Sequence, residues 1–407
     1  MSRHLFQRSL NLLLVGLLLF TFFIECGAEQ PCSSQFPTRI VLNITAAPSH
    51  AVAVNWRTAL LTENPRVQVA NASDAPDFHN DAREIKAKIT EITPIKDNVR
   101  YQYDAIIDGL QPQTLYAYRV GSDKNWSEWS QFKTAAASAE PFKFLYLGDP
   151  QNDIIAYVSR IFRSAYSKAP DAAFMLICGD LVADGSDDNL WAEWFYAAGW
   201  IPRLMPFVLT AGNHEYESVP RRLSPLYRPQ FNLPLNGPKG VEETAYFFDY
   251  QGARLVLLNS MEKIDEQARW LDSLLTVQPQ HWTILAMHFP LYPIASNRDY
   301  PDIRQKLLPI IDRNKVDLVL AGHDHAYARS YKLKNGQRVA DSQSGTVYMV
   351  SVSGPKQYNL ASKYFDLYAK MADHKQLFQI VNVSRNRLQV QTFTVTGQLL
   401  DEFELKK

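Results

Sequence analysis

The chain has 407 residues, of which 46% are hydrophobic, and this is enough for two domains with ordinary cores. Its 42 Lys and Arg residues balance 42 Asp and Glu residues, so the formal net charge is zero. This balance offers no support for nucleic acid as a ligand, because nucleic-acid binding normally leaves a basic excess, and it does not indicate a polybasic membrane-binding segment.

The first residues have the form of a secretory signal peptide. Arginines precede the apolar run 10–24, and small residues follow it up to Ala28. The run is short for a helix that spans a membrane. We therefore expect cleavage of residues 1–28 and a secreted or periplasmic protein that retains no stable membrane span. An uncleaved anchor is the runner-up, and a lipoprotein acylated at Cys26 is less favoured because Glu25 precedes that cysteine.

Residues 35–136 are expected to form an all-β domain. Short segments alternate apolar and polar residues, as in 40–44, and no long helical pattern interrupts them. A period of two with turn residues between the segments is typical of an antiparallel β-sandwich. Leu110 and Pro112 precede Tyr116 in a pattern that resembles the corner of fibronectin type III domains.

A linker at 133–141 leads into an α/β domain that we expect over residues 142–400. Apolar runs alternate there with helical patterns, which predicts layered β-sheets flanked by helices. Strands are expected at 142–147, 172–177, 205–210, 254–258, 283–287, 316–320, 347–352, 377–383 and 388–395. Helices are expected at 154–167, 188–199, 265–275, 303–313 and 364–371.

Five polar clusters share one feature, because each directly follows an apolar strand. They are Gly148-Asp149-Pro150-Gln151, Gly179-Asp180-Leu181, Gly212-Asn213-His214-Glu215, Met287-His288 and Gly322-His323-Asp324-His325. The carboxyl ends of strands in such sheets converge on one crevice, so these side chains can meet in space. Carboxylate, amide and imidazole groups without thiolate suit Mn, Fe or Zn.

Such a set of ligands predicts a hydrolytic site. Two metals held roughly 3.5–4 Å apart can share one carboxylate and one hydroxide, which forms at neutral pH because the cations lower the pKa of bound water. The remaining coordination positions can accept phosphate oxygens. In-line attack on phosphorus would follow, with the metals neutralising the charge that develops.

The motif set resembles the calcineurin-like metallophosphoesterase superfamily. With the β-sandwich and the sequence Gly322–Arg329 it is similar, more specifically, to the purple acid phosphatase branch. The resemblance covers nearly the whole chain after the signal peptide. It implies a hydrolase of phosphate monoesters that acts on a small phosphorylated substrate through a metal-bridging hydroxide, with two divalent or mixed-valence ions of Fe, Zn or Mn.

By position, the resemblance implies two metal sites that share one aspartate. The ligands implied for the first metal are Asp149, Asp180 and His325, and those for the second are Asp180, Asn213, His288 and His323. His214 would face the substrate and donate to a phosphate oxygen or to the leaving group. Glu215 would either orient His214 or be a polar turn residue.

Three positions depart from the family pattern. Ala183 stands where the branch has an iron-binding tyrosine, so we expect a protein that is not purple and that uses two divalent metals. Gln151 stands where other members have a histidine, and it either coordinates the first metal or is a polar loop residue. Asn297 and Arg298 replace histidines of the branch, which makes Arg298 a candidate clamp for phosphate.

Two other functions stay open. A phosphodiesterase would use the same metals but needs room for a second ester substituent, whereas a monoesterase needs cationic groups around three terminal oxygens. An inactive surface-binding protein, in which the sandwich recognises a ligand, is less favoured because every ligand of the second site is present. The sequence implies no particular oligomeric state.

Overall fold

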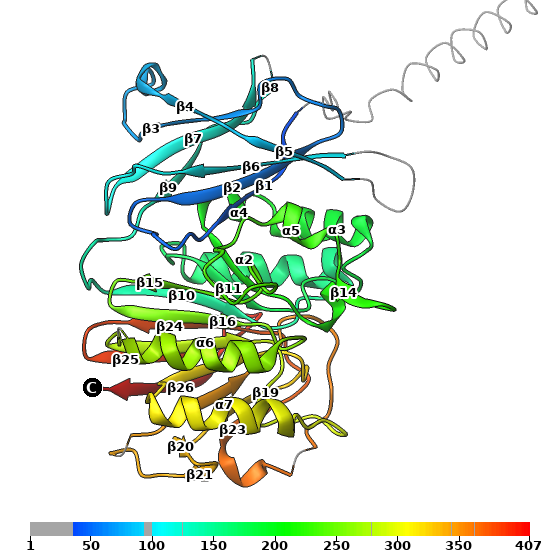
Figure 1. Ribbon diagram of the computed structural model, residues 1–407, viewed down its shortest axis with the longest axis vertical. Coiled ribbons are helices and arrows are strands. Elements are labelled where there is room, and N and C mark those ends of the chain that lie inside the picture. The colour runs from blue at the N-terminus through cyan, green and yellow to red at the C-terminus, as the bar shows by residue number, and fades with distance from the viewer. Residues whose placement is uncertain (1–35, 93–99, 124, 278, 343, 362) are drawn as a thin grey trace, which may run out of the picture.

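The structure is a computed structural model that describes residues 36–92, 100–123, 125–277, 279–342, 344–361 and 363–407. The expected signal peptide at 1–28 lies outside the described residues. Figure 1 shows an all-β part at one end of the molecule and an α/β part that makes up the rest. Among the described helices, none has the length and apolar character that crossing a membrane requires.

The first part is a β-sandwich, as the sequence predicts. One layer consists of β1 (Thr38–Asn43), β2 (Val52–Thr58), β6 (Arg100–Ile107) and β5 (Lys88–Ile92). The other consists of β4 (Arg83–Lys86), β3 (Arg66–Asn71), β7 (Leu115–Ser122), β8 (Asn125–Trp126) and β9 (Ser130–Lys133), with the short helix η1 (Phe78–Asp81) nearby. Trp56 stacks on Tyr103 in the core between the layers. The predicted corner is present, because the Gln111 backbone N–H donates to Tyr116 Oη at 2.8 Å.

The second part contains two larger sheets. Six strands of the first sheet are β12 (Phe207–Thr210), β11 (Met175–Cys178), β10 (Phe142–Leu147), β24 (Leu377–Val383), β25 (Arg387–Thr394) and β26 (Leu399–Lys406). The second sheet is β15 (Tyr246–Tyr250), β16 (Ala253–Leu258), β17 (Trp282–Met287), β18 (Leu318–Ala321), β22 (Val347–Val350), β19 (Tyr327–Ser330) and β23 (Tyr368–Ala372). Small hairpins are formed by β13 (Tyr216–Ser218) with β14 (Arg221–Leu223), and by β20 (Leu333–Lys334) with β21 (Gln337–Arg338).

The two sheets pack face to face, and helices cover their outer faces (Figure 1). The helical segments are η2 (Ile154–Val158), α2 (Ser159–Lys168), α3 (Asp188–Ala198), α4 (Ile201–Leu204), η3 (Asn213–Glu215), α5 (Tyr227–Gln230), α6 (Ile264–Val277), α7 (Pro301–Arg313) and η4 (Phe365–Leu367). The four residues at the end of β16 are apolar because both faces of the strand are buried. Leu255 and Leu257 pack into the core shared by both sheets, whereas Val256 and Leu258 pack into the core that includes α6 and α7. The predicted layered α/β fold is confirmed.

Two elements differ from the expectations. Residues 364–371 were expected as a helix, but they form the turn η4 and then β23, where Met371 lies opposite Ala328. Pairing with β19 at the sheet edge outweighs the helical spacing of the apolar residues. Strand β26 was not foreseen, and it pairs with β25 as far as Lys406, beyond the expected domain limit at 400.

The two parts of the molecule share one sheet. Strand β1 pairs in parallel with β12, with Asn43 opposite Phe207, so the first sheet runs through ten strands from β26 to β5. The Ile44 backbone N–H donates to the Phe207 carbonyl at 3.3 Å. This main-chain pairing joins the all-β part to the α/β part edge to edge.

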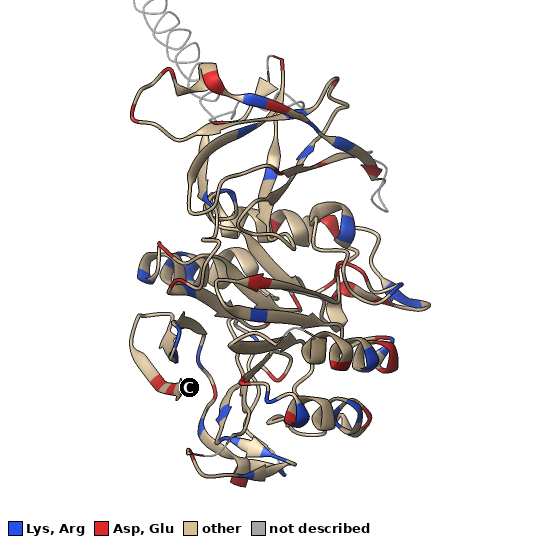
Figure 2. Cartoon of the chain, turned by 60° about the vertical axis from the view of Figure 1, so that its left-hand side comes forward, with Lys and Arg blue, Asp and Glu red and all other residues tan. Residues whose placement is uncertain are grey.

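An ion-pair cluster strengthens this joint. Acidic and basic residues are interspersed over both parts (Figure 2), and at the joint one carboxylate meets two guanidinium groups. Asp188, in α3, accepts hydrogen bonds from Arg39 at 2.7 Å and from Arg57 at 2.6 Å. The side chains of Arg39 and Arg57 are only 11% and 6% exposed, so both depend on this anion.

Replacing Asp188 by Asn is expected to lower the free energy of unfolding by about 2 kcal/mol, because two poorly exposed cations lose their anion. Urea unfolding followed by tryptophan fluorescence measures the change. The matched control is Asp171→Asn, since Asp171 is 68% exposed and pairs with Lys143 at the surface. The control should lose no more than about 0.5 kcal/mol. Equal losses in the two variants would contradict the role of Asp188.

Candidate metal centre

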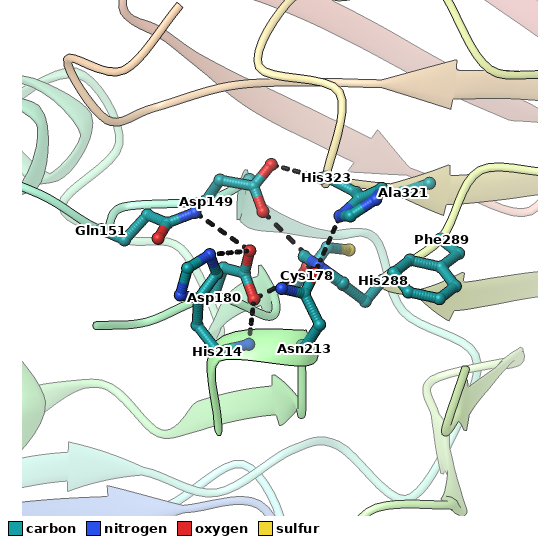
Figure 3. A network of polar contacts seen from close by, with 12 residues as sticks. Asp149, Gln151, Cys178, Asp180, Asn213, His214, His288, Phe289, Ala321 and His323 are labelled. Carbon is teal, nitrogen blue, oxygen red and sulfur yellow. Dashed lines mark hydrogen bonds and ion pairs between the residues drawn. The ribbon is translucent and has the colours of Figure 1, made fainter. Parts of the chain in front are cut away.

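The predicted ligands lie together at the carboxyl ends of strands from both sheets (Figure 3). Asp149 follows β10, Asp180 follows β11, Asn213 follows β12, His288 follows β17, and His323 and His325 follow β18. The two sheets meet face to face, so the loops beyond these five strands converge. Asp149 and His325 are 176 positions apart in the chain, and the fold brings them into one buried site.

Four of these residues have a left-handed backbone. Their φ angles are +43° at Asp149, +50° at Asp180, +74° at His323 and +49° at His325. A side chain in this region costs about 1–3 kcal/mol, and such strain is concentrated at functional sites. The close approach of two loops needs Gly212, because a Cβ there would lie 2.2 Å from Asp180 Oδ1.

The ligand atoms fall into two groups that share Asp180. In one group, atoms of Asp149, Asp180 and His325 lie within 4.8 Å of one another, and in the other the same holds for Asp180, His288 and His323. Asn213 Oδ1 lies 3.2 Å from His288 Nε2, which places the amide beside the second group. Apart from Asn213 all these ligands are buried. The geometry suits two cations that share one carboxylate.

Two buried oxygens support this fit. Asp149 Oδ1 and Gln151 Oε1 have no hydrogen-bond partner among the described residues. An unpaired buried polar atom costs about 1–3 kcal/mol, and a bound cation would satisfy both oxygens. Together with the imidazoles, these oxygens form a donor set that suits Fe, Zn or Mn.

The amide of Gln151 lies beside the first group. Its Nε2 donates to Asp180 Oδ2 at 3.0 Å (Figure 3). The same Nε2 lies 3.1 Å from His325 Nε2. The side chain is fully buried. Coordination of the first metal by Gln151 stays a prediction.

Backbone carbonyls orient two of the histidines. His288 Nδ1 donates to the Cys178 carbonyl at 2.8 Å, and His325 Nδ1 donates to the Lys356 carbonyl at 2.9 Å. Each hydrogen bond keeps the proton on Nδ1, which leaves Nε2 as a free ligand atom. Burial and the nearby Lys356 ammonium lower the pKa of His325 to about 3, so its imidazole is neutral.

The two carboxylates and His288 determine the charge of the centre without metal. Burial raises the pKa of Asp149 well above its usual value, and the charge of Asp180 adds to this effect. Burial alone would also raise the pKa of Asp180, but contacts with His288 outweigh it and lower that pKa. Burial would lower the pKa of His288, yet Asp180 and Asp149 raise it to about 9. A proton on His288 thus supplies positive charge that bound metal cations would supply in its place.

The two predicted substrate-facing residues differ in their surroundings. His214 Nδ1 donates to the Ala183 carbonyl at 2.6 Å, and its Nε2 lies 3.9 Å from Asp180 Oδ2. Its side chain is 30% exposed, so His214 borders the open side of the centre. Arg298 donates to Asp324 Oδ1 at 3.1 Å and to the His323 carbonyl. These contacts use part of its guanidinium group. Binding of phosphate by Arg298 stays a prediction.

Glu215 differs from the expectation that it orients His214. Its buried carboxylate accepts hydrogen bonds from backbone N–H groups of Asp180 at 2.9 Å, Leu181 at 2.8 Å and Gly212 at 2.7 Å. It therefore joins the loop after β11 to the loop after β12. Burial, with the charge of Asp180, raises the pKa of Glu215 to about 7.

The sequence assigned no role to two further residues of the site, Asp324 within the cluster after β18 and Tyr300. Asp324 accepts hydrogen bonds from the backbone N–H groups of Ile294 and Ala295, and so it anchors the loop that carries Arg298. Tyr300 Oη lies 2.6 Å from His323 Nε2. Their partners are 23 to 30 residues away in the chain, which no local motif reveals.

Comparisons with known proteins agree with this geometry. Residues 37–134 match the N-terminal domain of purple acid phosphatases, and residues 142–327 match the calcineurin-like phosphoesterase family. An uncharacterized protein of Mycobacterium tuberculosis is 26% identical over 359 residues, 75% of this chain and 67% of that protein. The Fe(3+)-Zn(2+) purple acid phosphatase 12 of Arabidopsis thaliana is 27% identical over 328 residues, 75% of this chain and 68% of that protein.

A solved structure shows the same fold. The purple acid phosphatase PPD1 from yellow lupin (Lupinus luteus) seeds superposes with a TM-score of 0.78 at 16% identity, covering 91% of this chain and 74% of that one. The fold and the site define a calcineurin-like metallophosphoesterase. The chain belongs to the purple acid phosphatase-like branch of that superfamily, with the N-terminal β-domain of the branch. It spans about two thirds of the length of the curated relatives that it matches.

Replacing Glu215 by Gln is expected to weaken metal binding, because the amide nitrogen cannot accept the backbone N–H groups that hold two ligand loops together. We expect a loss of about 10-fold in zinc affinity, measured by competition with a chromophoric chelator. Glu217→Gln is the matched control, since Glu217 lies two residues away and pairs with the exposed Arg222. Unchanged zinc affinity in Glu215→Gln would show that its carboxylate does not position the ligands.

Proposed function

We propose that the protein is a binuclear metal-dependent hydrolase of phosphate monoesters. The observation that carries this proposal is the sharing of Asp180 by two buried ligand groups. Two bound cations would lower the pKa of water and neutralise charge on a phosphate group. Fe, Zn and Mn suit the donor set, and the similarity to the Fe(3+)-Zn(2+) purple acid phosphatase 12 of Arabidopsis supports iron and zinc among the candidates.

The protein groups divide the work between holding ions and moving a proton. Asp149, Asp180 and His325 would hold the first ion. The second ion would be held by Asp180, Asn213, His288 and His323. His214 keeps one proton on Nδ1 through its bond to the Ala183 carbonyl. Its Nε2 is therefore the atom that can carry a second proton to a phosphate oxygen or to the leaving group.

The monoester is favoured over the diester by the cationic and donor groups near the centre. His214 borders it, and Arg298 is fixed beside His323 by Asp324. We propose a small phosphorylated molecule as the substrate, and a secreted or periplasmic location from the signal-peptide form of residues 1–28. An aryl monoester and the corresponding diester, assayed side by side with measurement of bound metal, test the proposal. Faster cleavage of the diester would overturn the monoester assignment, and a protein that binds no Fe, Zn or Mn and hydrolyses neither ester would overturn the enzyme.

Two alanine variants should separate metal binding from proton transfer. Asp180→Ala is expected to remove both metal binding and turnover, because both ligand groups lose their shared carboxylate. His214→Ala should keep two metals per chain and lose about 10²–10⁴-fold in kcat, the usual contribution of a positioned acid or base. Metal content by mass spectrometry and kcat for an aryl monoester measure the two effects. Full activity in Asp180→Ala would disprove the assigned centre.

A further inference from the structure

We infer that Tyr300 is a positioning residue that sets the tautomer and orientation of His323 for the second metal. This inference rests on the proposed binuclear function, and it assigns a role to Tyr300, which belongs to none of the five polar clusters. It starts from the contrast among the three histidines predicted as ligands. Backbone carbonyls accept hydrogen bonds from Nδ1 of His288 and of His325. In His323 it is Nε2 that lies within hydrogen-bond distance of a partner, and this partner is the hydroxyl of Tyr300.

The orientation of the His323 ring defines which nitrogen is the ligand. Its Nδ1 lies 3.1 Å from His288 Nε2, which in turn lies 3.3 Å from Asp180 Oδ1. Nδ1 therefore faces the ligand group and must be unprotonated to bind a cation. The proton of the neutral ring then lies on Nε2, which donates to Tyr300 Oη at 2.6 Å.

The tyrosine is held firmly enough to do this. Its ring stacks on Phe289 with centroids 4.3 Å apart and planes 11° from parallel. Phe289 directly follows the ligand His288, and its ring centroid is 4.4 Å from that of His323. The Tyr300 backbone precedes Pro301 at the start of α7, and the Arg304 N–H donates to its carbonyl at 3.0 Å. The helix start and the aromatic stack fix Oη relative to the imidazole.

A hydroxyl acceptor has a specific consequence here. Partners of the outer nitrogen of a metal-binding histidine fix its tautomer and ring orientation, and their loss typically costs about 10- to 100-fold in metal affinity. Carbonyl partners cannot be removed by substitution, but the hydroxyl of Tyr300 can. The first metal, which does not use His323 in the assigned ligand set, should not respond.

The test is Tyr300→Phe, which keeps the stacked ring and removes only Oη. Zinc is titrated into the metal-free full chain in competition with a chromophoric chelator. We expect the affinity for the second zinc ion to fall about 10- to 100-fold, with the first unchanged. The absorption spectrum of the Co²⁺-loaded variant should change for one of the two ions. The control is Tyr292→Phe, since the Tyr292 hydroxyl is buried without a hydrogen-bond partner among the described residues. Its zinc affinities should match those of the wild type.

The outcomes separate this inference from the proposed function. If the wild type binds fewer than two zinc ions, the binuclear function fails. If the wild type binds two and Tyr300→Phe binds both with unchanged affinity and an unchanged Co²⁺ spectrum, only the role of Tyr300 fails. Thermal unfolding in the presence of a chelator should be the same for Tyr300→Phe and the wild type. A large loss of Tm in that metal-free form would show that the hydroxyl supports the fold instead, and would also overturn the inference.

Discussion

The burial of Asp149 and Asp180 side by side is the constraint on which the rest of the site depends. Taking carboxylates out of water is unfavourable unless positive charge accompanies them. Both are at most 1% exposed, and the buried carboxylate of Glu215 approaches the Asp180 backbone as a third acid. Burial raises the pKa of Asp149 and Glu215, while a proton on His288 supplies one compensating charge. Bound cations would allow Asp149 to lose its proton and would replace the proton on His288.

Backbone strain at the same positions points in the same direction. Asp149, Asp180, His323 and His325 are all held at positive φ. A strained positive φ at such a residue persists only where the surrounding structure imposes it. Here Glu215 joins two of the loops through backbone N–H groups, and the Asp324 carboxylate anchors a third. These contacts order the loops before any ligand binds, so ligand binding does not carry the entropic cost of ordering them.

The convergence of the candidate ligands could be predicted from the sequence because two signals coincide at each of them. Asp180 and His288 each lie just after an apolar strand and carry a side chain of a type that can bind metal, so position and chemistry agree. Tyr300 carries neither signal, because it lies at the start of α7 and reaches His323 through space. The prediction of a helix at residues 364–371 is wrong for another reason. The spacing of their apolar residues fits a helix, but part of the segment pairs with β19 as a strand. This tertiary pairing outweighs the local preference.

The replacement of the family tyrosine by Ala183 changes the charge balance at the first metal. Ala183 now contributes only its carbonyl, which holds His214 Nδ1. The neutral amide of Gln151 contacts both Asp180 and His325 beside that site, and its buried oxygen has no hydrogen-bond partner within the described part of the chain. A tyrosinate would add a negative charge that favours a trivalent ion, whereas an amide adds none. With Asp149 and Asp180 as its candidate acidic ligands, the first site would be closer to neutrality with a divalent ion than with a trivalent one.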